Sequence, residues 1–270
     1  MTLSDRQPPI LSNKLHQAQS VFTPENLLRE ARRQKSIPPG TVPPIGVLDP
    51  DGDMVQYLVA TGQARRNPYW ACYHTVMYDF MRDGLEFGII GSVVGAAFAV
   101  LVAEELFACG CWLLISMTSA GQITPIGPPP YFILIDRALR DEGTSYHYLP
   151  PSSYSEIKRE LLDRVESAAR SSSLPITRGA TWTTDAPFRE TEAAIAYARS
   201  EGIHAVEMEA AALYAFAQAR SQAVVCFAHV TNQMGKVEND FEKGVAQGSL
   251  DALQVIELAA QGWLGWLKTS

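Results

Sequence analysis

Apolar and polar positions follow two different periods along the chain. Short apolar runs rich in β-branched residues, typical of buried strands, alternate with longer segments of helical periodicity. The predicted strands cover residues 45–49, 70–80, 85–93, 111–117, 131–136, 177–183, 204–208 and 223–230. The predicted helices cover residues 22–35, 54–62, 96–109, 155–171, 190–201, 209–220 and 249–267. This alternation favours an α/β fold with a largely parallel or mixed sheet covered on both faces.

Local signals sharpen two of these elements. Thr23 is a suitable helix N-cap, Pro24 suits the first helical position, and the helix dipole favours Glu25 in the first turn. Asp83-Gly84 lies between two apolar runs, which is typical of a tight hairpin turn. We therefore expect a helix that starts at Pro24 and a hairpin that turns at Asp83.

The longest apolar stretch, residues 88–117, does not have the pattern of a membrane span. Gly91, Gly95, Glu104 and Gly110 interrupt it, whereas a span needs about 20 consecutive apolar residues. The stretch therefore predicts a strand, a helix and a second strand.

Composition limits the possible partners and compartments. The chain has 270 residues, 47% hydrophobic, and a formal net charge of -7. It can bury one large core, and its charge disfavours nucleic acid and anionic membranes as partners. The polar N-terminus lacks the apolar region of a secretory signal, so we expect a cytoplasmic protein. We divide the chain into an N-terminal extension with one helix, residues 1–43, and one domain, residues 44–270.

The cysteines do not indicate a metal site. There are four, Cys72, Cys109, Cys111 and Cys226. Their spacing fits neither the usual zinc motifs nor a CxxC redox pair. We expect buried, reduced thiols and no bound metal.

Polar residues follow the carboxyl ends of several predicted strands, where ligands bind in α/β folds. Glu207, Met208 and Glu209 stand where a strand gives way to an alanine-rich helix. Two carboxylates among apolar residues need solvent or a ligand to satisfy them. Placed two apart at a strand end, they can point to one side and accept hydrogen bonds from the vicinal diol of a ribose. The structural alternative is that Glu209 stabilises the first turn of the helix.

Two further clusters also have structural alternatives. Thr118 and Ser119, after the strand at residues 111–117, can hold a phosphate or cap a turn. Val94 and Gly95 precede a helix whose free N–H groups suit an anion, but they can equally form a tight strand–helix junction.

The last two strands supply candidates for the recognition of a flat ring. Thr184 ends one strand, and Phe188 and Arg189 follow it. An aromatic ring can stack on a base and a guanidinium can bond its edge, or the segment can simply begin a helix. Asn232 ends the next strand and is well placed for a ligand, whereas we expect His229 to be a core residue.

Together these residues resemble the purine nucleoside and uridine phosphorylase family, nearer the uridine phosphorylase branch. The resemblance runs from about residue 44 to the C-terminal helix. Its most specific element is VEMEAAALYAFA at residues 206–217, followed by VVCFAHVTNQM at residues 224–234. LISMTSAGQI, GTSYHY and GATWTTDAPFRE support it in the expected order.

The resemblance implies a three-layer α/β/α fold with a mixed central sheet, and a homo-oligomer from dimer to hexamer. It implies an enzyme of nucleoside salvage, a glycosyltransferase that uses inorganic phosphate as co-substrate and no cofactor. Phosphate attacks C1′ of the nucleoside. Ribose 1-phosphate forms, and the free base is released. Positive charge develops on the sugar during this step, so an anion beside it lowers the barrier.

The resemblance also assigns roles by position. Glu209 matches a residue that holds the ribose hydroxyls, and Arg189 takes the role of binding the edge of the base. Asn232 replaces an aspartate of the purine-specific relatives, which implies a pyrimidine nucleoside. Substrate contacts are implied for Ser119, Thr118, Phe188, Thr184, Glu207, Met208, Val94 and Gly95.

Two phosphate-binding arginines of the family are missing. The GDPDR loop of the family appears as LDPDGD at residues 48–53, and Ser116 replaces the second arginine. Arg65 and Arg66 lie near the place where the family receives an arginine from a neighbouring subunit. We therefore expect phosphate contacts from these arginines and from Ser119, with a solvated basic turn as the alternative for the arginines.

Loss of both arginines weakens the capture of a dianion. If nothing replaces them, water takes the place of phosphate and the enzyme is a nucleoside hydrolase. His74 or Asp53 would then activate the water. A nucleoside-binding protein without catalysis is the third possibility.

Overall fold

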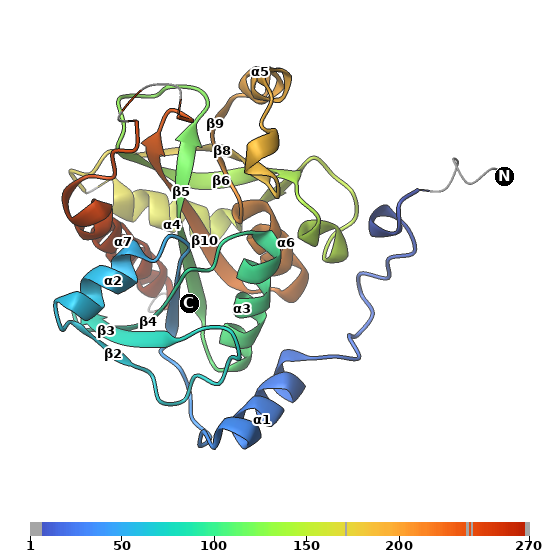
Figure 1. Cartoon of the computed structure of the whole chain (residues 1–270), viewed down its shortest axis with the longest axis vertical. Coiled ribbons are helices and arrows are strands. Elements are labelled where there is room, and N and C mark those ends of the chain that lie inside the picture. Colours follow the sequence, from blue (N-terminus) through green and yellow to red (C-terminus); the bar gives the residue numbers. More distant parts are fainter. Residues whose placement is uncertain (1–6, 171, 236–237, 239, 268–270) are drawn as a thin grey trace.

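The chain forms a mixed sheet with helices on both faces, as predicted (Figure 1). The computed structural model describes residues 7–170, 172–235, 238 and 240–267. The strands are β1 (Ile45–Asp49), β2 (Ala64–Arg66), β3 (Met77–Arg82), β4 (Leu85–Gly91), β5 (Leu113–Gln122), β6 (Tyr131–Asp141), β7 (Tyr154–Glu156), β8 (Ile176–Thr184), β9 (Ile203–Glu207) and β10 (Ala223–Asn232). The α-helices are α1 (Pro24–Lys35), α2 (Asp53–Ala60), α3 (Ala96–Ala108), α4 (Arg159–Ala169), α5 (Glu192–Ser200), α6 (Ala210–Arg220) and α7 (Ser249–Leu267).

Part of the sheet closes on itself. The strand order is β10-β6-β8-β9-β5-β1-β4-β3-β2, and β10 also pairs with β5. The β5–β10 pairing is parallel, whereas β6–β10 and β5–β9 are antiparallel. Strands β5, β9, β8, β6 and β10 therefore form a closed ring, from which β1, β4, β3 and β2 extend as an open wing.

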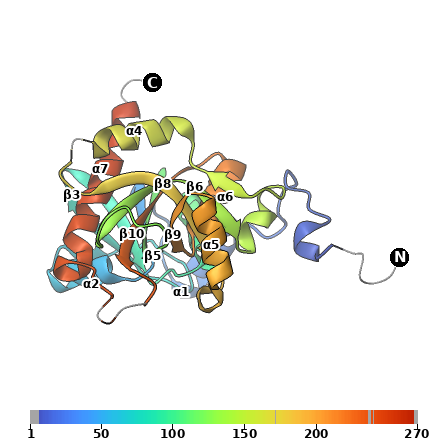
Figure 2. The ribbon, with the colours of Figure 1, turned by 90° about the horizontal axis from the view of Figure 1, so that it is seen from above.

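Strand β5 lies at the junction of the ring and the wing, and its first six residues are buried. Helices α2 and α7 contact each other, as do α3 and α6. Seen from above, α2 and α7 lie on one side of the strands and α6 lies on the other (Figure 2). Because helices cover both faces, the central strands consist of continuous apolar runs.

The predicted start of α1 and the predicted hairpin are confirmed. Thr23 Oγ1 accepts a hydrogen bond from the Asn26 backbone N–H at 3.3 Å. Strands β3 and β4 pair antiparallel around the turn. However, β3 begins later than the predicted residue 70. The side-chain oxygen of Asn67 accepts from the N–H groups of Tyr69 and Trp70, which turns the chain before the strand.

The structure also differs from the prediction at residues 155–171. A short strand, β7, pairs with β6 before α4 begins. Ser155 Oγ in β7 donates to the carbonyl of Ala211 at 2.6 Å, which ties the segment to α6. Three residues are too few for a periodic pattern, so the sequence did not predict this strand.

The apolar stretch at residues 88–117 folds as strand, helix and strand, as predicted. Over the part of the chain that the structure describes, no helix is long and apolar enough to cross a bilayer. The four cysteines are buried free thiols, also as predicted.

The N-terminal extension contacts the body in two places. Helix α1 packs on α3, and the segment before it reaches away from the body (Figure 1). Lys14 Nζ lies 3.0 Å from His147 Nδ1, and the His16 ring nitrogen lies 3.2 Å from the Tyr146 carbonyl. The division of the chain at residue 43 stays a prediction.

Candidate functional site

The directions of the strands bring the polar clusters close together. Strands β1 and β10 run parallel to β5, so their carboxyl ends lie at one edge of the sheet. Strand β9 runs antiparallel to β5, with Val206 opposite Gly121. The chain that leaves β9 therefore runs back along β5, and Glu209 reaches Thr118.

Glu209 is held by three donors inside the subunit. Its Oε1 accepts from the Gly95 N–H at 2.7 Å, and its Oε2 accepts from Thr118 Oγ1 at 2.7 Å and from the Met208 N–H at 3.3 Å. The residue is only 1% exposed. Burial, and then the charge of Glu207, raises the pKa of Glu209 to about 7 although the donors favour its anion. The carboxylate is therefore fixed in place and titrates near neutrality.

Glu207 accepts hydrogen bonds from a different set of residues. Its Oε1 accepts from the hydroxyls of Thr181 and Thr183, at 3.1 and 2.5 Å. Its Oε2 accepts from the N–H groups of Glu209 and Ala210, both at 2.7 Å. Burial raises the pKa of Glu207 against these hydrogen bonds. Glu207 thus caps the start of α6 and fixes it to β8, and its predicted contact with substrate stays a prediction.

Glu209 has room for one more hydrogen bond. A carboxylate offers about four acceptor positions, and the donors above occupy three of them. The fourth is on Oε1, next to Gly95. Val94 beside it is 53% exposed, and Met208 is partly exposed. The unused acceptor position of Glu209 therefore lies next to partly exposed residues, although Glu209 itself is 1% exposed.

Neighbouring residues of β5 face opposite sides of the sheet, as alternation in a strand requires. Thr118 Oγ1 donates to Glu209 on one side. Ser119 Oγ donates to Asp51 Oδ1 at 3.0 Å on the other. Strand β5 continues to Gln122, so the prediction that it ends at residue 117 is wrong, and Thr118 and Ser119 lie within it. One strand therefore connects two polar regions: a sugar side around Glu209 and an acidic side around Asp51.

The acidic side contains a cation that the sequence did not predict. Lys243, from the segment between β10 and α7, lies 2.6 Å from Asp51 Oδ2 and 2.5 Å from Asp53 Oδ2. Burial opposes the charge of Lys243, but the two carboxylates outweigh it and raise the pKa of this lysine. Its segment has no periodic pattern, so only the position after β10 could have pointed to it.

Asp49 adds a third carboxyl group to the acidic side. It ends β1 and accepts from the N–H groups of Gly52 and Val55, at 3.2 and 3.0 Å. Burial, with a smaller contribution from Asp51 and Asp53, raises the pKa of Asp49 to about 7. Its hydrogen bonds fix the loop that leads into α2.

The family model of the phosphorylase superfamily matches residues 44–260. The chain belongs to the phosphorylase superfamily. No curated protein sequence matches it.

Three solved structures resemble this member of the phosphorylase superfamily. Uridine phosphorylase from Vibrio fischeri ES114, in complex with 6-hydroxy-1-naphthoic acid, is 20% identical with a TM-score of 0.64, over 82% of this chain and 88% of that chain. Purine nucleoside phosphorylase from Toxoplasma gondii, in complex with immucillin-H, is 17% identical with a TM-score of 0.70, over 83% and 92%. AMP nucleosidase from Bacteroides thetaiotaomicron is 19% identical with a TM-score of 0.69, over 92% and 100%. At these identities the likeness shows the fold.

The candidate base-binding residues of this member of the superfamily lie at the end of β8, on the turn that follows it, and at the end of β10. Phe188 and Arg189 lie on an exposed turn, and Phe188 is 99% exposed. Thr184 is buried, and its hydroxyl accepts from the Ala186 N–H at 3.2 Å. Asn232 lies at the tip of β10, and its side-chain oxygen accepts from the Met234 N–H at 2.9 Å. Their roles toward a base stay predictions.

The predicted phosphate contacts are separated. Arg65 and Arg66 lie on β2, the last strand of the wing, whereas Ser119 lies on β5. Ser116 is buried, and its hydroxyl has no partner among the described residues. Among the residues that the structure describes, Lys243 is therefore a cation near Ser119. A contribution of Arg65 or Arg66 from a second subunit stays a prediction.

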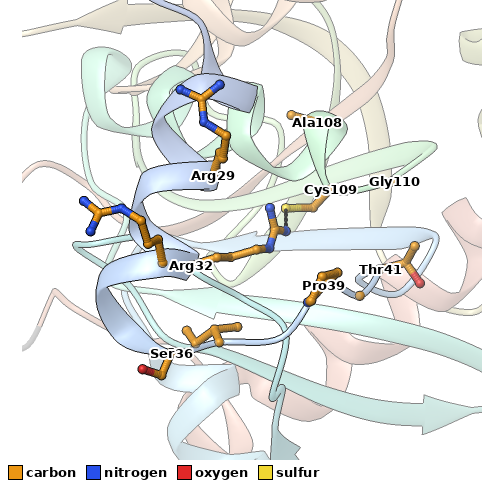
Figure 3. A pocket seen from close by; sticks show the side chains of 11 residues that line it. Arg29, Arg32, Ser36, Pro39, Thr41, Ala108, Cys109 and Gly110 are labelled. Carbon is orange, nitrogen blue, oxygen red and sulfur yellow. Dashed lines mark hydrogen bonds between the residues drawn. The ribbon is translucent and has the colours of Figure 1, made fainter.

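A hollow beside α1 looks basic from the sequence but is not an anion site. It has a volume of about 650 Å³ and is lined by Arg29, Arg32 and Arg33. The guanidinium groups of Arg29 and Arg32 lie apart (Figure 3), and both Arg29 and Arg33 pair with Glu30. Arg32 donates to the sulfur of Cys109 at 3.2 Å. The guanidinium groups do not converge, so the hollow is separate from the functional site.

Proposed function

We propose that this protein is an enzyme that cleaves the N-glycosidic bond of a ribonucleoside. The observation that carries the proposal is Glu209, which is fixed by Gly95, Thr118 and Met208 with one acceptor position open. A carboxylate so placed accepts a ribose hydroxyl. The matched superfamily model supports the reaction class.

The arrangement favours the transition state over the bound substrate. Cleavage develops positive charge on the sugar ring, and the Glu209 carboxylate is held where such charge is stabilised. Because Glu209 is buried, its interaction with that charge is stronger than it would be in water. The donors around it keep the carboxylate in position before substrate arrives, so little reorganisation is needed.

A pyrimidine is the base that we propose. Asn232 carries an amide rather than an acid at the tip of β10, and an amide donates a hydrogen bond to a carbonyl without transferring a proton. Its Nδ2 makes only long contacts, 3.5 Å to the Ala120 carbonyl and 3.3 Å to Thr231 Oγ1. These are weak hydrogen bonds, so the amide is available to a base carbonyl.

Two nucleophiles fit the proposed reaction. Inorganic phosphate, as in a glycosyltransferase, is favoured by Ser119 and by the cationic Lys243 near it. Water, as in a nucleoside hydrolase, is favoured by the negative charge of Asp51 and Asp53, which repels a dianion.

We also propose that the protein forms a homo-oligomer and that it is located in the cytoplasm. A second copy would cover the fully exposed Phe188 beside the site, which supports an oligomer from dimer to hexamer. The buried free thiols support a reducing compartment.

The test is base release from a panel of ribonucleosides by the wild type, Glu209→Ala and Glu209→Gln. We expect Glu209→Ala to lower kcat/KM by about a thousandfold or more, since it removes a preorganised charge at the reacting sugar. Glu192→Gln, on the exposed first turn of α5, is the matched control and should keep wild-type rates. Wild-type kinetics in Glu209→Ala, with the fold intact by circular dichroism, would refute the proposal.

A further inference from the structure

The N-terminal arm, residues 7–22, buries little of its own surface. No residue of its short 3₁₀ helix, Pro9–Leu11, is buried. Leu15, Val21 and Phe22 are 81%, 99% and 71% exposed. A groove of about 880 Å³ lies between the segment at residues 13–27 and helices α3 and α6. Burial of apolar side chains therefore contributes little to the attachment of the arm.

The arm makes two hydrogen bonds with the body among the residues that the structure describes. Both reach the 3₁₀ helix η3 (Thr144–His147), which follows β6. Lys14 Nζ lies 3.0 Å from His147 Nδ1, and His16 Nε2 lies 3.2 Å from the Tyr146 carbonyl oxygen. The polar attachment of the arm is thus concentrated on two neighbouring residues of η3.

The contact between Lys14 and His147 determines the protonation state of His147. A lysine ammonium only donates hydrogen bonds, so His147 Nδ1 accepts with its lone pair. The His147 ring is therefore neutral, with its proton on Nε2. A second proton would occupy Nδ1, remove the acceptor and place two cations side by side. The hydrogen bond from Lys14 exists only while His147 is neutral.

The second contact does not depend on protonation in this way. A carbonyl oxygen only accepts, so His16 Nε2 donates to Tyr146. A neutral and a protonated imidazole can both donate from this nitrogen. Of the two hydrogen bonds that hold the arm, the one from Lys14 to His147 is therefore the one that a proton breaks.

The charges next to His147 oppose its protonation while the arm is attached. Neither Lys14 nor His147 forms an ion pair with a carboxylate of the described residues. Burial lowers the pKa of His147, followed by the charge of Lys14 and then that of His16. Glu142, before η3, accepts from the Ser145 N–H at 3.0 Å.

The acidic groups on the far wall of the groove are engaged elsewhere. Glu104 of α3 pairs with Arg220 of α6 at 3.3 Å and accepts from Tyr148 Oη at 3.0 Å. Burial raises the pKa of Glu105, which favours its neutral form. Glu25 also lines the groove, in the first turn of α1, where the helix dipole stabilises its charge. These groups do not replace the hydrogen bond that His147 loses when it is protonated.

The sign of the pH dependence follows from the two states of the arm. With the arm released, His147 has the ordinary histidine pKa of about 6.5, whereas the attached arm lowers the pKa. The released state therefore binds a proton more readily than the attached state. The attachment is strongest above about pH 6.5 and weakens as the pH falls below that value.

The arm also contacts the segment that leads to the candidate base-binding turn. A β-carbon on Gly143 would lie 3.2 Å from Ile10 Cδ1 of the arm and 3.6 Å from Asp185 Oδ2. The Gly143 N–H donates to the same Asp185 oxygen at 2.8 Å. Asp185 precedes the turn with Phe188 and Arg189. The arm and this turn therefore pack against the same glycine.

We propose that Lys14 and His147 form a pH-operated clasp, which holds the N-terminal arm on η3 while His147 is neutral and releases the arm when His147 gains a proton. The proton shifts the equilibrium because it binds the released state more tightly than the attached state. The clasp is independent of the proposed glycosidic cleavage, and its tests need no substrate.

The first test follows the mobility of a nitroxide spin label on the arm, attached at Gln17→Cys, by electron paramagnetic resonance between pH 5 and pH 8. Gln17 is exposed, whereas the four native cysteines are buried, so the label reports on the arm. We expect a restrained label at pH 8 and a mobile label at pH 5, with a midpoint below about pH 6.5. A label that is equally mobile at both pH values overturns the clasp.

The second test introduces His147→Asn and His147→Lys into the labelled protein. The asparagine oxygen can accept from Lys14 at every pH, so we expect a restrained label throughout. The lysine is cationic throughout, so we expect a mobile label even at pH 8. His74→Asn is the control and should keep the wild-type transition, since the His74 ring contacts Tyr73 and Phe98 instead. A wild-type transition in His147→Asn, with the fold intact by circular dichroism, overturns the role of His147.

The third test measures the pKa of His147 by proton NMR of its ring in the unlabelled protein. We expect a pKa below about 6.5 in the wild type and a higher pKa in Lys14→Met, which removes the adjacent positive charge. Arg29→Met, which removes a cation that pairs with Glu30 on α1, is the control and should leave the pKa of His147 unchanged. The same pKa in the wild type and in Lys14→Met shows that Lys14 does not act on His147 and overturns the clasp.

Discussion

The sugar side and the acidic side lie on opposite faces of β5, and they satisfy their carboxylates differently. Glu209 is held by neutral N–H and O–H donors and keeps an acceptor position open. Asp51 and Asp53 are held by the charge of Lys243. The first arrangement contains no cation to offset the carboxylate, whereas in the second Lys243 offsets one of the two negative charges. Under the proposed function, the first arrangement suits a site at which positive charge develops on a sugar.

A second contrast lies within the sugar side, where Glu207 serves the fold and Glu209 carries the proposed function. Glu207→Ala would leave Thr181, Thr183 and two helix N–H groups without their acceptor. We expect it to lower the free energy of unfolding by on the order of 3 kcal/mol. Urea denaturation measures this change.

The isosteric variant sharpens the same prediction. In Glu207→Gln the amide oxygen can keep the two helix N–H groups, and the threonine hydroxyls can rotate to accept from the amide NH₂. We expect Glu207→Gln to lower the free energy of unfolding by less than Glu207→Ala does. Equal stability of the alanine variant and the wild type would show that Glu207 does not cap α6.

The next prediction concerns Glu209 and the pH dependence of the free energy of unfolding. Its pKa rises from about 4.5 in the unfolded chain to about 7 in the fold. The folded state therefore binds a proton that the unfolded state has released, so stability falls as pH rises from about 4.5 through about 7. We expect Glu209→Gln to gain on the order of 2 kcal/mol over the wild type between about pH 5 and pH 8.

Denaturation curves at several pH values test this sign. Asp49 has a pKa raised in the same direction, but it is present in both proteins, so its contribution cancels in the difference. A difference between wild type and Glu209→Gln that stays constant with pH would contradict the assigned titration.

The smallest expected effect is that of a substitution at Thr118 in β5. Thr118→Val removes one donor from Glu209, which we expect to cost about fivefold to tenfold in kcat/KM for ribonucleosides, equivalent to about 1 kcal/mol. Thr118→Ser keeps the hydroxyl and is the control. Steady-state kinetics should show that Thr118→Val raises the pH at which activity appears, since the Glu209 anion loses a hydrogen bond. An unchanged pH profile of activity would show that Thr118 does not contribute to the sugar side.

Local sequence patterns predicted the elements that local physics determines. The strand at residues 45–49 and the helix at residues 249–267 match β1 and α7 because their apolar periods are strong. The start of α1 was correct because Thr23 and Pro24 form a cap within a few residues. In contrast, the closure of the ring depends on β10 pairing with β5, a long-range contact that no local pattern contains.

The candidate site was only partly predictable for the same reason. The pair Glu207 and Glu209 was expected to point to one side, as in a strand. Glu209 has φ −130 and ψ −39, so the chain has already left the strand and the period of two no longer applies. Lys243 lies in no predicted element, because its contacts depend on the loop after β1 that folds against it.

The edge of the wing has a consequence for solubility. The closed ring leaves β2 as the outer strand of the wing, with unpaired backbone groups along one side. Exposed Arg65 and Arg66 carry adjacent positive charges there. Two copies that met edge to edge in antiparallel register would bring these charges together, so the strand repels the cross-chain pairing that leads to aggregation.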